Sequence, residues 1–585
     1  MRHTERPQNQ ALLKSLLKRG CSELLANCLS RRNLDSAEDQ ILQLSRLPPA
    51  RALKDMEEAS QRVVHAIHHG EHIVIVGDYD ADGATATATL MLGLRRMGAV
   101  CDFVVPDRFR LGYGLSQALI KELLTHTCES DTRRPRLLIT VDNGINAVQA
   151  VDFAKSVGLD VIVTDHHLPG AQRPDCLVVD PHRDDCSFPF KTIAGVGLAF
   201  YLLIAVRTLL TKTRPSTPPA PIDDLLPLVA MGTVADLVRL CADNRRLVHQ
   251  GLFKLRQGLA PQGLLAMFQA AGRDANQAIA SDFGFAIAPM LNAAGRLTDM
   301  SLGIACLVET DERRAKVMAE ELRALNQARK QIQEEQSEQA LAMAELMVDQ
   351  APESTGLVVS HADWHEGIVG LIASRLKERW KLPVFAFAPS RENPSLLKGS
   401  GRSIAGIHLR DCLARVDSLE PGLLDRFGGH AMAAGLTIEA SQLNTFKQRL
   451  DQAMTELYGK AGALLGQDLM LTDGALRSEQ FHLENAIELE NQIWGQGFEA
   501  PLFRNSFRVL QQRPLKERHQ RLRLGLVDKA GEPWVGEPLE AIWFNAPNAL
   551  APQLTLAYHL GVNRFRGWPE LQLQIIADLT NEQLQ

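Results

Sequence analysis

The sequence predicts a multidomain α/β protein: a parallel-sheet unit, a smaller α/β unit joined to it by a long helix, and a small C-terminal β-barrel. Short β-branched apolar runs alternate with helical segments from about residue 71, as is typical of buried parallel strands. Glycine and proline are absent between Asp311 and Pro352, which predicts one long helix. The last part of the chain contains alternating strand-like runs and most of the tryptophans, which indicates the barrel.

The length of 585 residues supports several domains, since one domain usually spans about 100 to 200 residues. The composition shifts described above place the boundaries. We expect an N-terminal helical segment over residues 1–70, a parallel-sheet domain over 71–310, a connecting helix over 311–350, a second α/β domain over 351–460 and the barrel over 465–585.

Composition excludes several classes of protein. The hydrophobic fraction of 45% is too high for a wholly disordered chain. The formal net charge of -6 excludes a polycation, although a local basic groove can still bind nucleic acid. The first residues are polar and charged, and the longest apolar stretch, Ala194–Val206, is too short to span a bilayer. The nine cysteines are scattered without a C-x-x-C pair, so we expect a cytoplasmic protein with reduced thiols and no membrane partner.

Four apolar runs in the first α/β unit are expected to be parallel strands. An Ala/Thr/Leu-rich helix from about Ala84 to Met97 lies between the first two. The Pro-rich segment Arg214–Pro221 must be a loop. A helix of about 40 residues after Asp311 would reach roughly 60 Å and join two lobes. The expected strands are His72–Val76, Leu137–Val141, Val161–Thr164 and Leu177–Val179, and a strand at Gly356–Ser360 opens the second unit.

Acidic and imidazole side chains follow each strand-like run of the first unit. In open parallel sheets, ligands bind beyond the carboxyl ends of the strands. If the runs are neighbours, these side chains converge on one edge. They occur in Gly77-Asp78-Tyr79-Asp80-Ala81-Asp82-Gly83 after the first run, Val141-Asp142-Asn143-Gly144 after the second, Asp165-His166-His167 after the third and Asp180-Pro181-His182 after the fourth.

Clustered carboxylates cannot all stay ionised without counter-cations. Aspartate oxygens with one or two imidazoles suit Mg²⁺ or Mn²⁺, and two such ions about 3.5 to 4 Å apart can clamp a phosphate and activate water. Each motif alone has an ordinary alternative: a calcium loop or solvated turn, an Asn-Gly turn, or polar surface histidines. Their joint occurrence, in order and each after an apolar run, favours the metal site.

These motifs, with Gly232-Thr-Val-Ala-Asp236, resemble those of the DHH phosphoesterase superfamily. Trp364-His-Glu-Gly367, Gly399-Ser-Gly-Arg-Ser403 and Phe427-Gly-Gly-His430 are similar to the DHHA1 module that accompanies DHH domains. Motifs carry the resemblance from about residue 70 to 440, and the overall layout carries the rest. Within the superfamily the chain is similar to 5′→3′ exonucleases specific for single-stranded DNA, which release mononucleotides by two-metal hydrolysis in repair and recombination.

The resemblance implies a role for each matching residue. Two ions, Mg²⁺ or Mn²⁺, would share Asp142. One ion would add Asp82, His166 and Asp236, and the other Asp80 with Asp78 nearby. His167 would face the scissile phosphate as a ligand or acid, and Asp165 is expected to orient a neighbour. From the sequence alone, Asp236 is interpreted as an ordinary acid in a helix over Leu228–Val238.

The polarity of such an enzyme requires a pocket for the 5′ phosphate, for which arginine is the expected tool. The resemblance points to Arg108, with Ser400 and Arg402 from the second unit, and to Arg296 as a further phosphate contact. Tyr113 could stack on a base, and His430 could contact a nucleotide across the cleft. Surface charge, loop packing and a turn histidine are the competing interpretations.

The C-terminal part resembles the oligonucleotide-binding (OB) fold with which such exonucleases hold single strands. Basic residues interleaved with aromatics suit a groove that follows phosphates while bases stack, although a solvated basic strand is the alternative. The resemblance alone implies single-stranded DNA as substrate and a single-strand-binding protein and a helicase as partners. The cluster comprises Arg508, Arg513, Lys516, Arg518, Arg521 and Arg523, with Phe503 and Phe507 close by.

Three other functions are compatible with part of this pattern. Another DHH phosphoesterase would act on short oligoribonucleotides, cyclic dinucleotides or polyphosphate, but such substrates need no long groove. A replication scaffold on a degenerate DHH core would not need the intact set of acids and histidines. A haloacid-dehalogenase-like phosphotransferase also places D-x-D after a strand, but it would form a covalent aspartyl phosphate.

Overall fold

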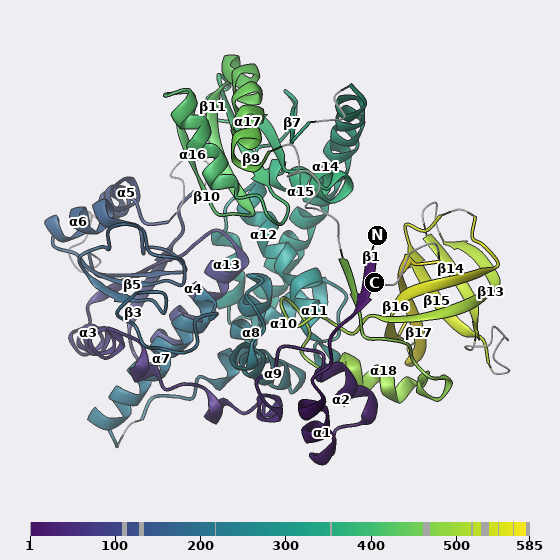
Figure 1. Cartoon of the computed structure of the whole chain (residues 1–585). Helices are drawn as coiled ribbons and strands as arrows, with labels where there is room; N and C mark the ends of the chain where they lie inside the picture. The colour runs from purple at the N-terminus through teal and green to yellow at the C-terminus, as the bar shows by residue number, and fades with distance from the viewer. Residues whose placement is uncertain are drawn as a thin grey trace.

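The computed structural model describes residues 2–107, 114–127, 134–216, 218–350, 354–459, 469–515, 519–527, 537–547, 549–565 and 567–580 (Figure 1). It contains a five-stranded parallel sheet, a second five-stranded sheet, a closed five-stranded barrel and a two-stranded sheet. The multidomain α/β architecture with a long helix and a C-terminal barrel is therefore as predicted.

The first sheet is wholly parallel, with the strand order β3-β2-β4-β5-β6. The four predicted strands are present. The edge strand β3 was not predicted, because its exposed Val100 and Asp102 interrupt the apolar run that marks a buried strand. The bounds are β2 (His72–Val76), β3 (Val100–Val104), β4 (Pro135–Val141), β5 (Asp160–Thr164) and β6 (Leu177–Val179).

Helices cover both faces of this sheet, because alternate strand residues point to opposite sides. Ile73 and Ile75 belong to the core formed with α3 (Met56–His69), α4 (Ala81–Arg96) and α7 (Gly195–Thr213). Val74 and Val76 face the opposite side, where they form a core with α5 (Gln117–Thr127) and α6 (Val148–Ser156). In the described residues, α7 alone is long and apolar enough to cross a membrane. Of its most apolar 18-residue stretch, 61% is buried within the protein.

A helical region follows the sheet and ends in a helix of 39 residues, α14 (Glu312–Gln350). Asp311 caps it by accepting a hydrogen bond from the backbone N–H of Arg314, 2.9 Å away. At 1.5 Å per residue the helix is about 58 Å long. Ala315, near the start of α14, packs in the core of this helical region. Ala340 packs in the core of the second α/β unit, so α14 joins the two (Figure 1). The region before it comprises α8 (Leu226–Ala235), α9 (Ala242–Arg256), α10 (Gln262–Ala270), α11 (Ala280–Asp282), the π-helix η7 (Phe283–Ile287), α12 (Ala288–Leu297) and α13 (Ser301–Val308).

The second α/β unit is a mixed sheet with the order β10-β11-β9-β8-β7, in which only β7 and β8 are parallel. Helices α15, α16 and α17 complete it. The bounds are β7 (Leu357–Ser360), α15 (Val369–Trp380), β8 (Val384–Pro389), β9 (Leu396–Arg402), α16 (Leu409–Leu419), β10 (Arg426–Gly429), β11 (Ala433–Glu439) and α17 (Leu443–Tyr458).

The C-terminal barrel closes in the order β13-β14-β15-β17-β16, and α18 (Leu483–Glu490) precedes it. The first part of the N-terminal segment is attached here, whereas its last helix, α3, packs on the parallel sheet. It is not wholly helical: besides α1 (Gln10–Lys18) and α2 (Glu23–Leu29) it contains β1 (Arg2–Glu5), which pairs in parallel with β12 (Leu469–Thr472). The barrel strands are β13 (Phe503–Leu515), β14 (His519–Val527), β15 (Leu539–Phe544), β16 (Gln553–Asn563) and β17 (Glu570–Asp578).

A buried ion pair fixes this attachment. Arg32, directly after α2, donates two hydrogen bonds to the carboxylate of Asp473, over 2.6 and 3.0 Å. Both side chains are about 1% exposed. Planar bidentate pairing is the geometry in which a buried arginine and a carboxylate satisfy each other best.

Candidate metal centre and nucleic-acid cleft

The topology of the parallel sheet creates the site. From β2 the chain proceeds to β3 on one side, whereas β4 lies on the other side of β2. The loops that follow β2 and β4 therefore diverge and leave a crevice, which is where open α/β sheets bind ligands. Asp78 to Asp82 follow β2, and Asp142 follows β4. The predicted convergence of strand-end acids has its cause in this strand order.

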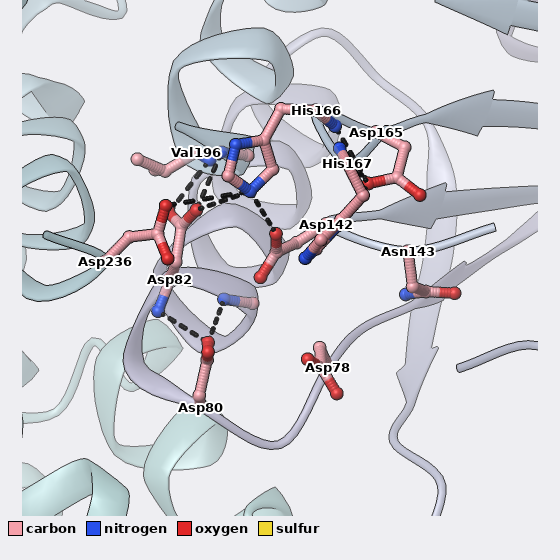
Figure 2. A network of polar contacts seen from close by, with 12 residues as sticks. Asp78, Asp80, Asp82, Asp142, Asn143, Asp165, His166, His167, Val196 and Asp236 are labelled. Carbon is pink, nitrogen blue, oxygen red and sulfur yellow. Dashed lines mark hydrogen bonds and ion pairs between the residues drawn. The ribbon is translucent and has the colours of Figure 1, made fainter. Parts of the chain in front are cut away.

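The start of α4 fixes two of the aspartates. Asp80 is the N-cap, and its carboxylate accepts hydrogen bonds from the N–H groups of Asp82 and Gly83 at 2.9 and 3.0 Å. Asp82 lies in the first turn and is 1% exposed. Its carboxylate accepts hydrogen bonds from Gly195 and Val196, at 2.7 and 3.0 Å, so the N-terminus of α7 holds it (Figure 2).

The turn after β4 aims Asp142 into the crevice. Asp142 has a φ of 63°, a left-handed conformation that is uncommon for residues other than glycine. Asn143 supports the turn: its amide donates to the carbonyl oxygens of Val76 and Val141 and accepts from the N–H of Leu115. Sequence reasoning treated this Asn-Gly as a common turn, and only the three-dimensional structure shows that Asn143 ties the ends of β2 and β4 together.

The ring of His166 lies between Asp82 and Asp236 on one side and Asp142 on the other, as Figure 2 shows. Its Nε2 lies 3.0 Å from an oxygen of Asp142, 3.6 Å from one of Asp236 and 4.0 Å from one of Asp82. Asp236 is the C-cap of α8 rather than part of a helix reaching residue 238. The acid that looks ordinary in the sequence alone therefore points into the cluster.

Among the described residues, three groups of side chains each have ligand atoms within 4.8 Å of one another. Oxygen-rich sets with an imidazole suit Mg²⁺ or Mn²⁺, and Asp142 occurs in two of the groups. The donor set thus fits two ions that share Asp142, with the ligand partition that the resemblance implies, which stays a prediction. The groups are Asp82, His166 and Asp236; Asp78, Asp80 and Asp142; and Asp142, His166 and His167.

The electrostatics of the cluster favour cations. Burial, reinforced by Asp80, raises the pKa of Asp82 to about 7. Burial and Asp82 raise the pKa of Asp236 to about 9 and that of Asp142 well above its usual range. Burial, with His167 adding to it, lowers the pKa of His166 to about 4, so the ring is neutral at physiological pH and can ligate a metal. Each acid would release its proton more readily next to a divalent ion.

Asp165 orients the histidines, as the sequence analysis expected. One of its oxygens accepts from Nδ1 of His167 at 2.7 Å, and the other accepts from the N–H of Ile145 at 2.9 Å. Burial disfavours a charged His167, but the hydrogen bond to Asp165, together with the negative charges of Asp165, Asp236 and Asp78, raises the pKa of His167 to about 9. His167 is therefore a cation at neutral pH, a suitable partner for a phosphate oxygen.

Asp180 and His182, which the sequence analysis noted without assigning a role, lie behind the histidines. Asp180 accepts a hydrogen bond from the N–H of His182 at 2.6 Å, and the ring of His182 bonds the backbone of His166. Burial raises the pKa of Asp180 to about 7. This pair supports the backbone that presents His166.

Two glycines allow the close packing of this centre. A Cβ on Gly195 would lie 2.7 Å from the Cβ of Asp142, and a Cβ on Gly232 would lie 2.7 Å from an oxygen of Asp82. Real Cβ contacts essentially never fall below 3.0 Å. The glycine in Gly232-Thr-Val-Ala-Asp236 is therefore required by the approach of α8 to the carboxylate of Asp82.

The second α/β unit faces the metal centre across a cavity of about 590 Å³. Three of the predicted phosphate-binding residues, Arg296, Ser400 and Arg402, line it together with Asp80. The Arg402 guanidinium donates to Ser400 Oγ at 3.0 Å, and burial lowers the pKa of Arg402. A half-buried guanidinium that lines the same cavity as Asp80 suits a terminal phosphate.

A second cavity, of about 700 Å³, is lined by His167 of the first unit and His430 of the second. Tyr79 lines both cavities and so lies between them. Sequence reasoning missed Tyr79, although an aromatic residue between two acids of the first motif was a usable signal. Arg108 and Tyr113, the two remaining predicted contacts, fall outside the described residues.

The barrel requires one correction. Phe503 and Phe507 were expected to interleave with the basic cluster, but they are 2% and 0% exposed and form the barrel core. Arg508, Arg513, Arg521 and Arg523 are exposed on β13 and β14, and the last two form ion pairs with Glu540. Lys516 and Arg518 fall outside the described residues. The exposed surface is therefore basic without these two aromatics.

Comparison with known proteins agrees with this architecture. The chain matches the DHH family N-terminal domain over residues 72–233, the DHHA1 domain over 353–456 and the RecJ OB domain over 472–577. It is 43% identical, over 95% of both chains, to the single-stranded-DNA-specific exonuclease RecJ of Salmonella typhimurium. It also resembles two crystal structures of RecJ from Thermus thermophilus.

The structure in complex with Mn²⁺ has a TM-score of 0.78 and 29% identity and covers 100% of this chain and 80% of that one. The structure in complex with Mg²⁺ has a TM-score of 0.72 and 27% identity, with 100% and 79% coverage. The identity of 43% over 95% of both chains, together with matches to the DHH, DHHA1 and RecJ OB domains, establishes that the chain belongs to the RecJ family of exonucleases.

Proposed function

We propose that the protein is a divalent-metal-dependent exonuclease specific for single-stranded DNA, which degrades the strand from its 5′ end and releases mononucleotides. The observation that carries this proposal is the meeting of Asp82, His166 and Asp236 with Asp78, Asp80 and Asp142 at one sheet edge. The similarity to RecJ exonucleases supports the substrate. The polarity and the ligand roles are inferred from the site.

The chemistry is hydrolysis of a phosphodiester. The aspartates and His166 of these groups would hold two Mg²⁺ or Mn²⁺ ions, which would acidify a bound water and neutralise charge on the phosphate. Asp142 would be the ligand shared by the two ions, because it belongs to two of the three groups. His167, charged at neutral pH, lines the adjoining cavity and can donate a hydrogen bond to a phosphate oxygen or a proton to the leaving oxygen.

Polarity would come from anchoring of the 5′ end. Arg402 and Ser400 face Asp80 across the cavity, and Arg296 lines the same space. A terminal phosphate held there would place the next phosphodiester over the metal centre, so that one nucleotide is removed in each cycle. Arg108 is proposed as a further ligand of that phosphate and Tyr113 as a base contact. His430 is proposed to contact the nucleotide beside His167.

The cellular setting is proposed on the same basis. An exonuclease that requires single strands needs another activity to supply them, which favours a helicase as a partner. Exposed single strands are covered by single-strand-binding protein, the second proposed partner. A role in DNA repair and recombination in the cytoplasm follows from these partners.

The test is digestion of end-labelled oligonucleotides with Mn²⁺ or Mg²⁺. We expect single strands to be shortened from the 5′ end, blunt duplex to resist and chelator to stop the reaction. Asp82→Ala should abolish turnover, whereas Asp175→Ala, which changes an exposed carboxylate of the same domain, should leave it intact. Equal cleavage of blunt duplex, or faster cleavage of dinucleotides than of long strands, would contradict the proposal.

A further inference from the structure

Two stretches of backbone lead to the carboxylates of the metal centre. Thr192 lies three residues before Gly195, whose N–H donates to Asp82 at 2.7 Å. Arg239 lies three residues after Asp236, and the ligand atom of Asp236 is within 4.8 Å of that of Asp82. The way in which these two stretches are joined therefore affects how the two carboxylates are placed relative to each other.

The side chain of Asn244 joins the two stretches. Asn244 is 0% exposed and lies in the first turn of α9. Its amide nitrogen donates to the carbonyl oxygen of Thr192 at 2.6 Å and to that of Arg239 at 2.9 Å. An asparagine amide has two N–H groups, so each of them serves one stretch. One short, buried side chain thus sets the separation between the backbone before α7 and the backbone after α8.

The turn between Asp236 and Arg239 is strained. Leu237 has a φ of 59°, a left-handed conformation that is rare for a bulky residue. Its side chain is 68% exposed, so its own packing does little to offset the strain. The hydrogen bond from its N–H to the carbonyl oxygen of Val234 is long, at 3.4 Å. Strained backbone persists where the surrounding structure holds it, and it occurs frequently at functional sites.

Contacts just after the turn supply part of this support. The N–H of Leu240 donates to the carbonyl oxygen of Gln496 at 2.8 Å, and a Cβ on Gly497 would be 2.7 Å from Cγ of Arg239. These contacts hold the segment against the C-terminal part of the chain. Asn244 holds the same segment against the backbone that leads to the N-terminus of α7, which is the side of the metal centre.

We infer that Asn244 is a positioning residue of the metal centre: by tying Arg239 to Thr192 it keeps the left-handed turn at Leu237 and, with it, the carboxylate of Asp236 beside Asp82. Asn244 acts through the backbone and is not itself a ligand. Removal of groups that orient metal ligands lowers metal affinity or activity about 10- to 100-fold. This inference rests on the proposed function for the role of Asp82 and Asp236 as ligands.

The test is calorimetric titration of the full chain with Mn²⁺ in the absence of DNA, next to thermal melts in EDTA. Asn244→Ala should raise the Kd for Mn²⁺ about tenfold and lower kcat at limiting Mn²⁺, with KM for the single strand unchanged. Asn485→Ala is the matched control, because the amide of Asn485 also donates to a backbone carbonyl, that of Gln480, at 2.9 Å. It should leave the Kd unchanged. An unchanged Kd in Asn244→Ala, with a lower Tm in EDTA, would overturn the positioning role.

A rescue experiment tests the link to the turn. Glycine adopts a left-handed conformation without strain, so Leu237→Gly should restore much of the Mn²⁺ affinity that Asn244→Ala loses. Lys381, the C-cap of α15 in the second α/β unit, has a φ of 55°. Lys381→Gly relieves the same kind of strain there and should restore none of the affinity. If Asn244→Ala alone does not fold, the two double variants give the same comparison, and equal Mn²⁺ affinity in both would overturn the inference.

Failure of this inference is distinguishable from failure of the proposed function. An Mn²⁺ Kd that Asn244→Ala leaves unchanged refutes the positioning role, even if the unaltered protein degrades single strands. An unaltered protein that binds Mn²⁺ but does not shorten single strands refutes the proposed function, and a tenfold weaker Mn²⁺ binding by Asn244→Ala would still support the role of Asn244.

Discussion

Replacing Asp236 by asparagine should increase the stability of the metal-free protein and at the same time abolish efficient turnover. Asparagine has the same shape as aspartate but no charge. Asp236 is the C-cap of α8, and the backbone N–H groups of the α7 N-terminus donate to Asp82 and not to Asp236. The substitution therefore leaves these hydrogen bonds in place. In the absence of metal the carboxylate is a source of repulsion, because its ligand atom lies within 4.8 Å of that of Asp82. In the presence of metal the same carboxylate is a ligand.

The size of the effect follows from the geometry. Two unit charges 4.8 Å apart interact by about 3.5 kcal/mol at an effective dielectric constant of about 20. With its pKa near 9, Asp236 is mostly protonated at pH 8, so the relief is well below the value for two full charges. We expect Asp236→Asn to gain about 1 to 3 kcal/mol in EDTA at pH 8, a rise of several degrees in Tm. Mutation of groups that only orient metal ligands lowers metal affinity or activity about 10- to 100-fold. Loss of a ligand should therefore lower kcat at least about 100-fold.

The assay is thermal unfolding at pH 8 with EDTA and with Mn²⁺, next to nuclease kinetics on a single strand. Mn²⁺ should stabilise the unaltered protein more than the variant, because the variant has lost one ligand. Asp175→Asn, at an exposed carboxylate paired with Lys155, is the control and should change neither quantity. A variant that is less stable in EDTA, or that Mn²⁺ protects as fully as the unaltered protein, would refute the assignment of Asp236.

Two further outcomes test the electrostatics and the anchor. In EDTA, stability should fall as pH rises from 7 to 9: the pKa values of Asp236 and His167, each about 9, exceed their unfolded values, so the folded state holds protons that the unfolded chain releases. Thermal melts in EDTA should show this fall, and melts in saturating Mn²⁺ should not. A stability in EDTA that does not change between pH 7 and 9 would contradict the prediction. Arg402→Ala should raise KM about tenfold for 5′-phosphorylated strands and much less for 5′-hydroxyl strands, since charge-assisted phosphate bonds are lost. Steady-state kinetics on the two substrates decide this, and equal effects would remove Arg402 from the anchor.

The buried strands of the catalytic sheet could be predicted because burial on both faces leaves a continuous apolar run in the sequence. His72–Val76 is such a run, whereas the edge strand Val100–Val104 alternates with exposed residues and gives no such signal. The strand β1 was missed for a related reason: its partner lies at the opposite end of the chain, and no local pattern encodes that pairing.

The site was predictable to the extent that its residues follow strands. Asp142 and His166 are marked by the apolar runs before them, but Asp236 ends a helix, and only the family resemblance singled it out. Phe503 and Phe507 show the opposite error, since proximity to arginines in sequence does not reveal that alternate strand residues face the barrel core.

The pairing of β1 with β12 has a consequence for how the molecule is made. The partner of Arg2 is Leu469, and Arg32 needs Asp473, so these N-terminal residues must wait until more than 400 further residues have been made before they can settle. At about 15 residues per second, that delay is roughly half a minute. During this interval β1 and Arg32 lack their partners, and a bulky tag fused ahead of Arg2 would compete with the last step of assembly.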